Sequence, residues 1–180
     1  MPHRITTGLL LTAFVFAPTT AFAPTTAFAV ARPPLPGMPA VTDPNDIYAA
    51  DRPNQMSDAV RGVRSLVYVP NLRSNSVSII DPNTFKVIRT VKVGKEPQHV
   101  VPSWDLKTLW VNNDLGNSLT PIDPRTGKFG KPVKVHDPYN LYFTPDGKYA
   151  VVMASKDHQI VFRDAHTMKV TSPSPRAATV

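Results

Sequence analysis

"NSVSIIDPNTFKVIRTVKV" occupies residues 75–93, and "NSLTPIDPRTGKFGKPVKV" occupies residues 117–135. The second stretch begins 42 positions after the first, and ten of the nineteen aligned positions are identical. A third, fainter copy follows 41 residues later, where "DAHTMKV" (164–170) aligns with "DPRTGKF" (123–129). A period of this length is typical of propeller blades and of arrays of helical pairs. The chain is therefore built from repeats.

The local pattern within each repeat favours strands. Short runs rich in Val, Ile, Tyr, Phe and Trp are separated by Asp-Pro, Asn-Asp and Pro-Asp-Gly turn signals. "VSIID" (77–81) and "VIRTVKV" (87–93) alternate with period two, and no 3.6-residue stripe is long enough for a helix. Four short strands per repeat make one propeller blade. We therefore expect an all-β fold, a partial β-propeller of about three four-stranded blades.

The repeats resemble those of the YVTN family of β-propellers. "VYVPN" (67–71) and "LWVNN" (109–113) stand where that family has its Tyr-Val-Thr-Asn signature, and "EPQHVV" (96–101) and "TPDGKY" (144–149) match its other strands and turns. The similarity covers residues 66–170. The resemblance implies exported, YncE-like relatives within the superfamily of WD40-like and cytochrome d1 haem-domain-like propellers. It also implies that "PQHVV" starts an innermost strand.

The chain divides into four expected segments. Residues 1–31 have the features of a signal peptide: a basic start, an apolar run and a small-x-small site at residues 29–31. The apolar run is too short for a transmembrane helix, which needs roughly 20 residues. We expect a Pro-rich linker and lead-in over residues 32–64, the blades over 65–172 and a disordered tail over 173–180. The expected location is secreted, extracellular or in the cell envelope.

Two features depart from the pattern of the YVTN family. The chain holds about three blades, whereas a closed propeller typically has 4–8. After Val170 the alternation stops, because "TSPSPRAATV" (171–180) places prolines where the outer strand should continue. We interpret the chain as a truncated form of a longer propeller. Its unpaired blade edges would allow self-assembly.

Composition excludes several kinds of site. The 180 residues include no cysteine, so disulfides, covalent c-type haem and thiolate metal sites are excluded. The net charge is +7, but Lys and Arg are scattered singly, so we expect no nucleic-acid partner. The sequence has no nucleophile elbow, no phosphate-binding loop and no zinc-spaced histidine pair. We therefore predict no catalytic residues and no metal site.

The candidate ligand-binding residues lie where the inner strands start. His99 and Asn140 occupy equivalent positions there, with Gln98 and Tyr139 beside them. Such a group could bind a ligand at the mouth of a central channel. In the alternative interpretation, His99 caps the turn after Pro97 and hydrogen-bonds a neighbouring blade.

Other conspicuous residues have structural explanations. We expect Asx turns at three aspartates, turns at two asparagines, packing between blades for both tryptophans, and solvated turns for three histidines. These residues are Asp81, Asp123 and Asp164; Asn71 and Asn113; Trp104 and Trp110; and His136, His158 and His166.

The expected function is that of a secreted binding scaffold without a cofactor, whose partner is a protein, a polysaccharide or a small molecule. The resemblance implies an alternative, a cofactor-binding propeller enzyme whose remaining blades are missing. That enzyme would be similar to haem d1 nitrite reductases or to quinoprotein dehydrogenases, with histidines holding the cofactor.

Overall fold

The computed structural model describes residues 43, 45–46 and 48–171. The expected signal peptide (1–31) and tail (173–180) lie outside these residues. Within the described part of the chain, the regular structure consists of strands and two short 3-10 helices, and no helix is long and apolar enough to cross a membrane. This architecture confirms the all-β fold class.

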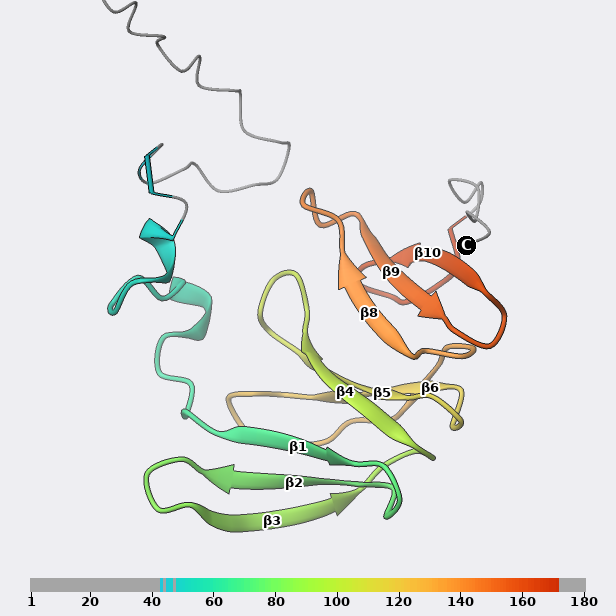
Figure 1. Ribbon diagram of the computed structural model, residues 1–180, viewed down its shortest axis with the longest axis horizontal. Helices are drawn as coiled ribbons and strands as arrows, with labels where there is room; N and C mark the ends of the chain where they lie inside the picture. The colour runs from blue at the N-terminus through green and yellow to red at the C-terminus, as the bar shows by residue number, and fades with distance from the viewer. Residues whose placement is uncertain (1–42, 44, 47, 172–180) are drawn as a thin grey trace, which may run out of the picture. The chain divides into compact units, whose positions relative to one another are not determined.

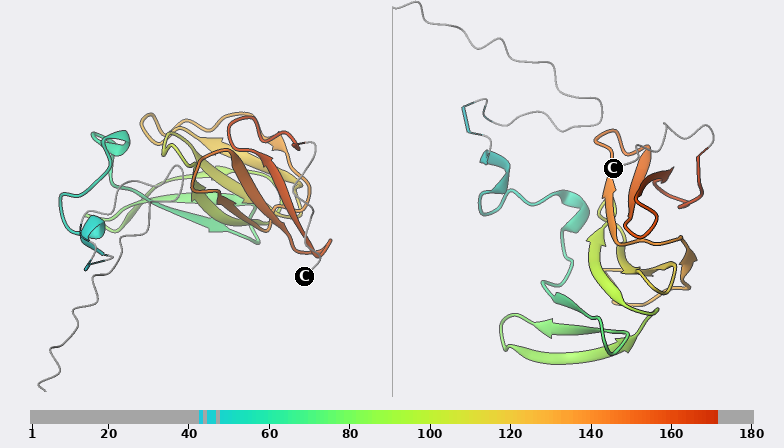
Figure 2. Two further views of the ribbon diagram at one scale, coloured as in Figure 1. Left: turned by 90° about the horizontal axis from the view of Figure 1, so that it is seen from above. Right: turned by 45° about the vertical axis from the view of Figure 1, so that its right-hand side comes forward.

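The strands form three antiparallel sheets, which we call blades 1, 2 and 3 (Figure 1). In each blade the strands lie side by side in chain order, and the turned views show their twist (Figure 2). Blade 1 contains β1 (Val67–Asn71), β2 (Ser76–Asp81) and β3 (Lys86–Lys92). Blade 2 contains β4 (Pro97–Pro102), β5 (Leu109–Asn113), β6 (Ser118–Ile122) and β7 (Val133–Lys134). Blade 3 contains β8 (Asn140–Phe143), β9 (Tyr149–Ala154) and β10 (Gln159–Asp164).

The two flanking blades have three described strands instead of the four expected. Before β1, the chain forms the 3-10 helices η1 (Ala49–Asp51) and η2 (Asp58–Val60), and η2 lies where the repeat would place an inner strand. Ser57 favours the helical turn, because its side chain accepts the N–H of Ala59. In blade 3 the outer strand is reduced to one bridge between Arg163 and Val170.

The aspartates at the ends of β2, β6 and β10 form Asx turns, as predicted. Oδ1 of Asp81 accepts the N–H of Asn83 at 2.8 Å, and Oδ1 of Asp123 accepts that of Arg125 at the same distance. Oδ1 of Asp164 accepts the N–H of His166 at 3.1 Å. These carboxylates therefore shape the turns into the outer strands.

Two apolar clusters pack the blades against each other, and burial of this surface is the main force that holds them. Between blades 1 and 2 the cluster contains Val77, Val111 and Ile122. Between blades 2 and 3 it contains Trp110, Leu119, Val135, Leu141, Ala150, Val152 and Met168. Trp104 also connects blades 2 and 3, because its indole N–H donates to the Pro145 carbonyl at 3.0 Å. The expectation that both tryptophans lie between blades is therefore confirmed.

Asn71 and Asn113 lie in strands, whereas the sequence suggested turns. Asn113 is fully buried, and its Nδ2 donates to Ser118 Oγ at 3.2 Å and Thr120 Oγ1 at 2.9 Å on the neighbouring strand. Asn71 donates in the same way to two serines of β2. These contacts pair the amide N–H groups inside the sheets, where an unpaired group would cost stability, while Oδ1 of Asn113 has no partner among the described residues.

A second polar contact, which we call the clasp, joins successive blades. Asn75 lies in the turn between β1 and β2, and Asn117 lies in the turn between β5 and β6. Their φ angles are 52° and 47°. Oδ1 of Asn75 accepts the N–H of Glu96, and Oδ1 of Asn117 accepts the N–H of Asp137, each at 2.9 Å. Glu96 and Asp137 stand just before the inner strand of the next blade. The clasp therefore ties the hairpin of one blade to the start of the next.

The lead-in is held against blade 2. The guanidinium of Arg125 donates to the carbonyls of Arg61 at 3.1 Å and Ala59 at 2.7 Å. A cavity of about 400 Å³ lies between the lead-in and blades 1 and 2, lined by residues that include Val60, Val63, Leu66, Tyr68, Val100 and Leu109.

Gly147 and Gly62 form a matched pair for testing the contact of Trp104 with blade 3. Both have left-handed φ, 69° and 76°. A Cβ on Gly147 would lie 2.6 Å from the Trp104 ring, whereas a Cβ on Gly62 would meet nothing within 4 Å. We expect Gly62→Ala to cost about 1 kcal/mol of backbone strain. Gly147→Ala should cost roughly 1 kcal/mol more, because the ring is displaced. Urea unfolding followed by fluorescence measures both, and equal losses would contradict the contact.

Candidate functional site

The structure brings two of the four predicted ligand-binding residues together at the start of the inner strands. The rings of His99 on β4 and Tyr139 before β8 meet edge to face, with centroids 5.7 Å apart and an angle of 86°. Nε2 of His99 is buried and has no hydrogen-bond partner. The second interpretation, in which His99 hydrogen-bonds a neighbouring blade, therefore has no support at this nitrogen. His99 instead packs against the ring of the neighbouring blade.

The other two predicted residues flank this pair. Asn140 is the first residue of β8, and Gln98 lies in β4 where the ladder to β5 shifts register between Pro97 and His99. A bulge of this kind redirects a side chain at the edge of a sheet. We call Gln98, His99, Tyr139 and Asn140 the mouth.

A hollow of about 310 Å³ lies beside the mouth on blade 3. Two mouth residues, Tyr139 and Asn140, contribute to its wall, and Gln98 and His99 do not. His158 also lines the hollow, although the sequence indicated only a solvated turn there. The remaining wall residues are Tyr142, Met153, Ala154, Ser155 and Gln159.

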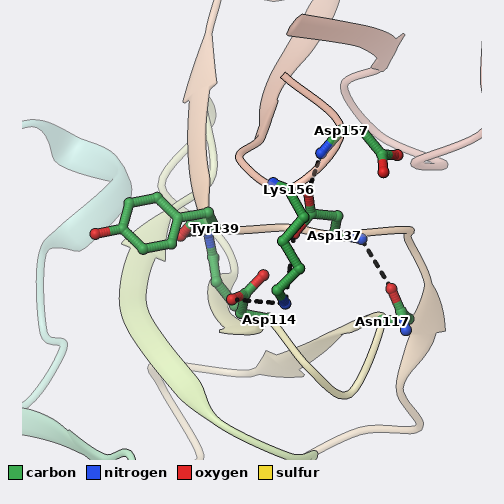
Figure 3. A network of polar contacts seen from close by, with 7 residues as sticks. Asp114, Asn117, Asp137, Tyr139, Lys156 and Asp157 are labelled. Carbon is green, nitrogen blue, oxygen red and sulfur yellow. Dashed lines mark hydrogen bonds and ion pairs between the residues drawn. The ribbon is translucent and has the colours of Figure 1, made fainter. Parts of the chain in front are cut away.

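A cluster of charged side chains lies near Tyr139 (Figure 3). Asp114 follows β5 and Asp137 precedes β8, and their side chains are only 7% and 3% exposed. Nζ of Lys156, in the turn after β9, lies 3.2 Å from Asp114 Oδ2 and 3.8 Å from Asp137 Oδ1. One ammonium thus faces two carboxylates from different blades. The Tyr139 ring points away from this cluster (Figure 3).

Asp137 belongs to both the clasp and this cluster. Its N–H donates to Asn117, and its Oδ2 accepts the N–H of Lys156 at 2.6 Å and of Asp157 at 3.2 Å. Its carboxylate therefore holds the β9–β10 turn, and its backbone holds the turn of blade 2. The sequence analysis missed this role. The sequence does mark this position, because Asp114 aligns with Leu72 of the first repeat and Ser155 of the third, neither of which is charged.

The two carboxyl groups have opposite pKa shifts. Burial raises the pKa of Asp114, and the neighbouring Asp137 carboxyl adds to the rise, while Lys156 acts against it. Burial acts against ionisation of Asp137 as well. However, the Asp114 carboxyl, the N–H groups of Asp157 and Lys156 and the Lys156 charge together hold the pKa of Asp137 below its usual value. The pair therefore takes up its first proton on Asp114.

Two other histidines of the described part of the chain, His136 and His166, lie outside the mouth. Nε2 of His136 contacts Asp157 Oδ2 at 2.9 Å, and His136 is 65% exposed. His166 lies in the exposed turn after β10. Among the residues that the structure describes, no group of three or more His, Cys, Asp or Glu side chains is placed to hold a metal ion.

A model of the family described as YNCE-like beta-propeller matches residues 38–172. The chain belongs to the YNCE-like β-propeller family. This confirms the resemblance seen in the repeats. The match begins inside the lead-in, so the family pattern includes residues before the first described strand.

Several solved structures are similar to this YNCE-like propeller. Hydrazine synthase of Kuenenia stuttgartiensis is 28% identical with a TM-score of 0.52, over 64% of this chain and 33% of that chain. A protein from Lactobacillus plantarum is 19% identical with a TM-score of 0.51, over 64% and 39% of the two chains. A periplasmic gluconolactonase of Pseudomonas aeruginosa is 20% identical with a TM-score of 0.49, over 66% and 40%. The chain thus spans 33–40% of these three proteins. No curated protein matches it.

The opposite pKa shifts predict opposite effects of two matched substitutions. The pKa of Asp114 is higher in the folded state than in the unfolded state. The free energy of unfolding therefore falls as pH rises from the unfolded-state pKa through the folded-state pKa, and Asp114→Asn should remove that fall. The lowered pKa of Asp137 adds stability that is lost as pH falls through its folded value. Asp137→Asn should cost about 1–3 kcal/mol at neutral pH, because it weakens bonds to a buried charge.

Urea unfolding between pH 3 and pH 8 separates these effects. Asp51→Asn, at an exposed carboxylate of the lead-in that lies outside this cluster, serves as the control. Identical profiles for Asp114→Asn and Asp137→Asn would contradict the assignment of the proton to Asp114.

Proposed function

We propose that the chain is an exported β-propeller module that binds an acidic polysaccharide at the mouth and acts by binding rather than by catalysis. The observation that carries this proposal is Tyr139, which is 38% exposed and whose ring meets the His99 ring edge to face. A tyrosine ring fixed by a neighbour offers a large contact area and loses little conformational entropy on binding. Tyr139 is therefore already ordered for contact with a ligand at the mouth.

The groups around Tyr139 suit a polymer rich in hydroxyl and carboxylate groups. The side-chain amides of Gln98 and Asn140 can donate to and accept from sugar hydroxyls. The net charge of +7, of which the leader contributes one charge through Arg4, attracts an acidic chain and raises its local concentration. Export rests on the signal-peptide features of residues 1–31. A cell-envelope or extracellular polysaccharide is then the polymer within reach.

The alternative, a cofactor-binding propeller enzyme, depends on imidazole groups at the inner strands. Of the described residues, His99 is the one histidine within an inner strand. Its Nε2 is buried behind neighbouring side chains, so it is not open to a haem iron. The residues present at the mouth therefore do not fit a haem, and the binding function is preferred.

Alginate, an acidic polysaccharide, tests the proposed binding. The full chain should bind soluble alginate in a calorimetric titration, with affinity that falls as salt rises. Tyr139→Ala should weaken binding about tenfold or more, since it removes the anchor. Tyr48→Ala is the matched control, because Tyr48 is 68% exposed in the lead-in, away from the mouth. Equal affinities for the two variants would show that charge alone binds the polymer and would contradict a site at Tyr139.

Export makes a separate prediction. When a bacterial host produces the chain with its own leader, the protein outside the cytoplasm should begin at Arg32, because cleavage follows the small residues at 29 and 31. Intact-mass measurement of the periplasmic or culture fraction checks this. Uncleaved protein confined to the cytoplasm would contradict export.

A further inference from the structure

Blades 1 and 3 each leave one face uncovered by the described residues. In blade 1, Val77 is buried against blade 2, so the alternate residues Val69 and Ser78, which pair across β1 and β2, face the other way. In blade 3, Val152 is buried against blade 2, so Val151 and Met153 face away from it. We call these the open faces of blades 1 and 3. Tyr142 on the second face is 55% exposed, and Val67 on the first is 46% exposed.

The repeat shows what each open face is shaped to contact. Val69 and Asn71 of blade 1 align with Val111 and Asn113, which blade 2 buries against blade 1. Likewise, Val151 and Ile160 of blade 3 align with Trp110 and Leu119, which blade 2 buries against blade 3. The two open faces are therefore the two halves of an interface that the chain already forms twice.

We propose that a second copy of this chain docks the open face of its blade 1 on the open face of blade 3, head to tail. The reciprocal contact then closes a ring of two copies. Three blades from each copy make six, which lies within the range of 4–8 blades found in closed propellers. A head-to-tail contact forms a ring when its rotation closes and an open filament when it does not. The hollow on blade 3, whose wall includes Tyr142 and Met153, is filled in this assembly.

One half of a further clasp is already shaped at the free end of blade 3. His158, in the turn of blade 3, aligns with Asn75 and Asn117 and has the same left-handed backbone, with φ of 52°. Asn54, in the lead-in before blade 1, lies 42 residues before Glu96 and is also left-handed, with φ of 67°. The lead-in after Asn54 forms η2 instead of an inner strand, so Asn54 is not placed as Glu96 is. In the ring, the imidazole of His158 lies where an asparagine side chain accepts in the other clasps. This proposal does not rest on polysaccharide binding, although the second copy would cover a hollow that Tyr139 and Asn140 also line.

A complementation experiment on the full chain tests the head-to-tail contact. Val69→Asp places a charge on the open face of blade 1, and Met153→Asp places one on the open face of blade 3. Each contact needs one face of each kind, so either variant alone should be a monomer by light scattering, while the unsubstituted chain should have twice the monomer mass. An equimolar mixture of the two variants should return to twice the monomer mass, because one intact pair of faces remains. Recovery of this mass also shows that both variants are folded.

Phe85→Asp, at a turn residue that is 85% exposed and outside both faces, should leave the two-copy mass unchanged. If Met153→Asp does not fold, Tyr142→Asp places the same charge on the same face at a more exposed position. The proposal is overturned if the unsubstituted chain is a monomer up to high micromolar concentration or grows beyond two copies. It is also overturned if either variant alone still forms the two-copy species.

Discussion

The hydrogen bond from the Asp137 N–H to the Asn117 side chain fixes where blade 3 begins, and its repeat from Glu96 to Asn75 does the same for blade 2. Both acceptors have left-handed backbone, which asparagine tolerates better than most residues. The apolar clusters supply most of the energy between blades, but they are non-directional. The clasp supplies the direction, because it joins a defined turn of one blade to the first residues of the next. The mouth depends on it, since Tyr139 follows Asp137 by two residues.

Asp137 links this constraint to the electrostatics of the chain. Its backbone completes the clasp, and its carboxylate holds the next turn and faces Asp114 and Lys156. The fold does not require a carboxyl group at position 114, because the other repeats have Leu72 and Ser155 there. Burying a second carboxyl beside the first is unfavourable unless one of them holds a proton. Blades 2 and 3 therefore meet at a contact whose strength depends on protonation, near Tyr139 of the proposed binding surface.

The repeat made the fold predictable from the sequence. The contacts between residues far apart in the chain could not be predicted in this way. The period, the alternation in "VSIID" and the Asp-Pro turns predicted the blades, their strand order and the Asx turns. The pattern could not predict that η2 replaces the inner strand of blade 1, because that depends on a local cap at Ser57. It placed His99 and Tyr139 at the same end of the blades, but their ring contact depends on how two blades pack. The pairing of Asp114 with Asp137 likewise depends on distance in space.

Native-state hydrogen exchange at the amides of Glu96 and Asp137 tests most directly whether the clasp joins the blades. Amides that open only when neighbouring blades separate exchange as slowly as those of the strands between them. Our account predicts that both amides are protected to the same degree as the ladder amides of Val111 and Val152, with the same dependence on added denaturant. Exchange at both positions as fast as in an exposed loop, while Val111 and Val152 stay protected, would contradict the account.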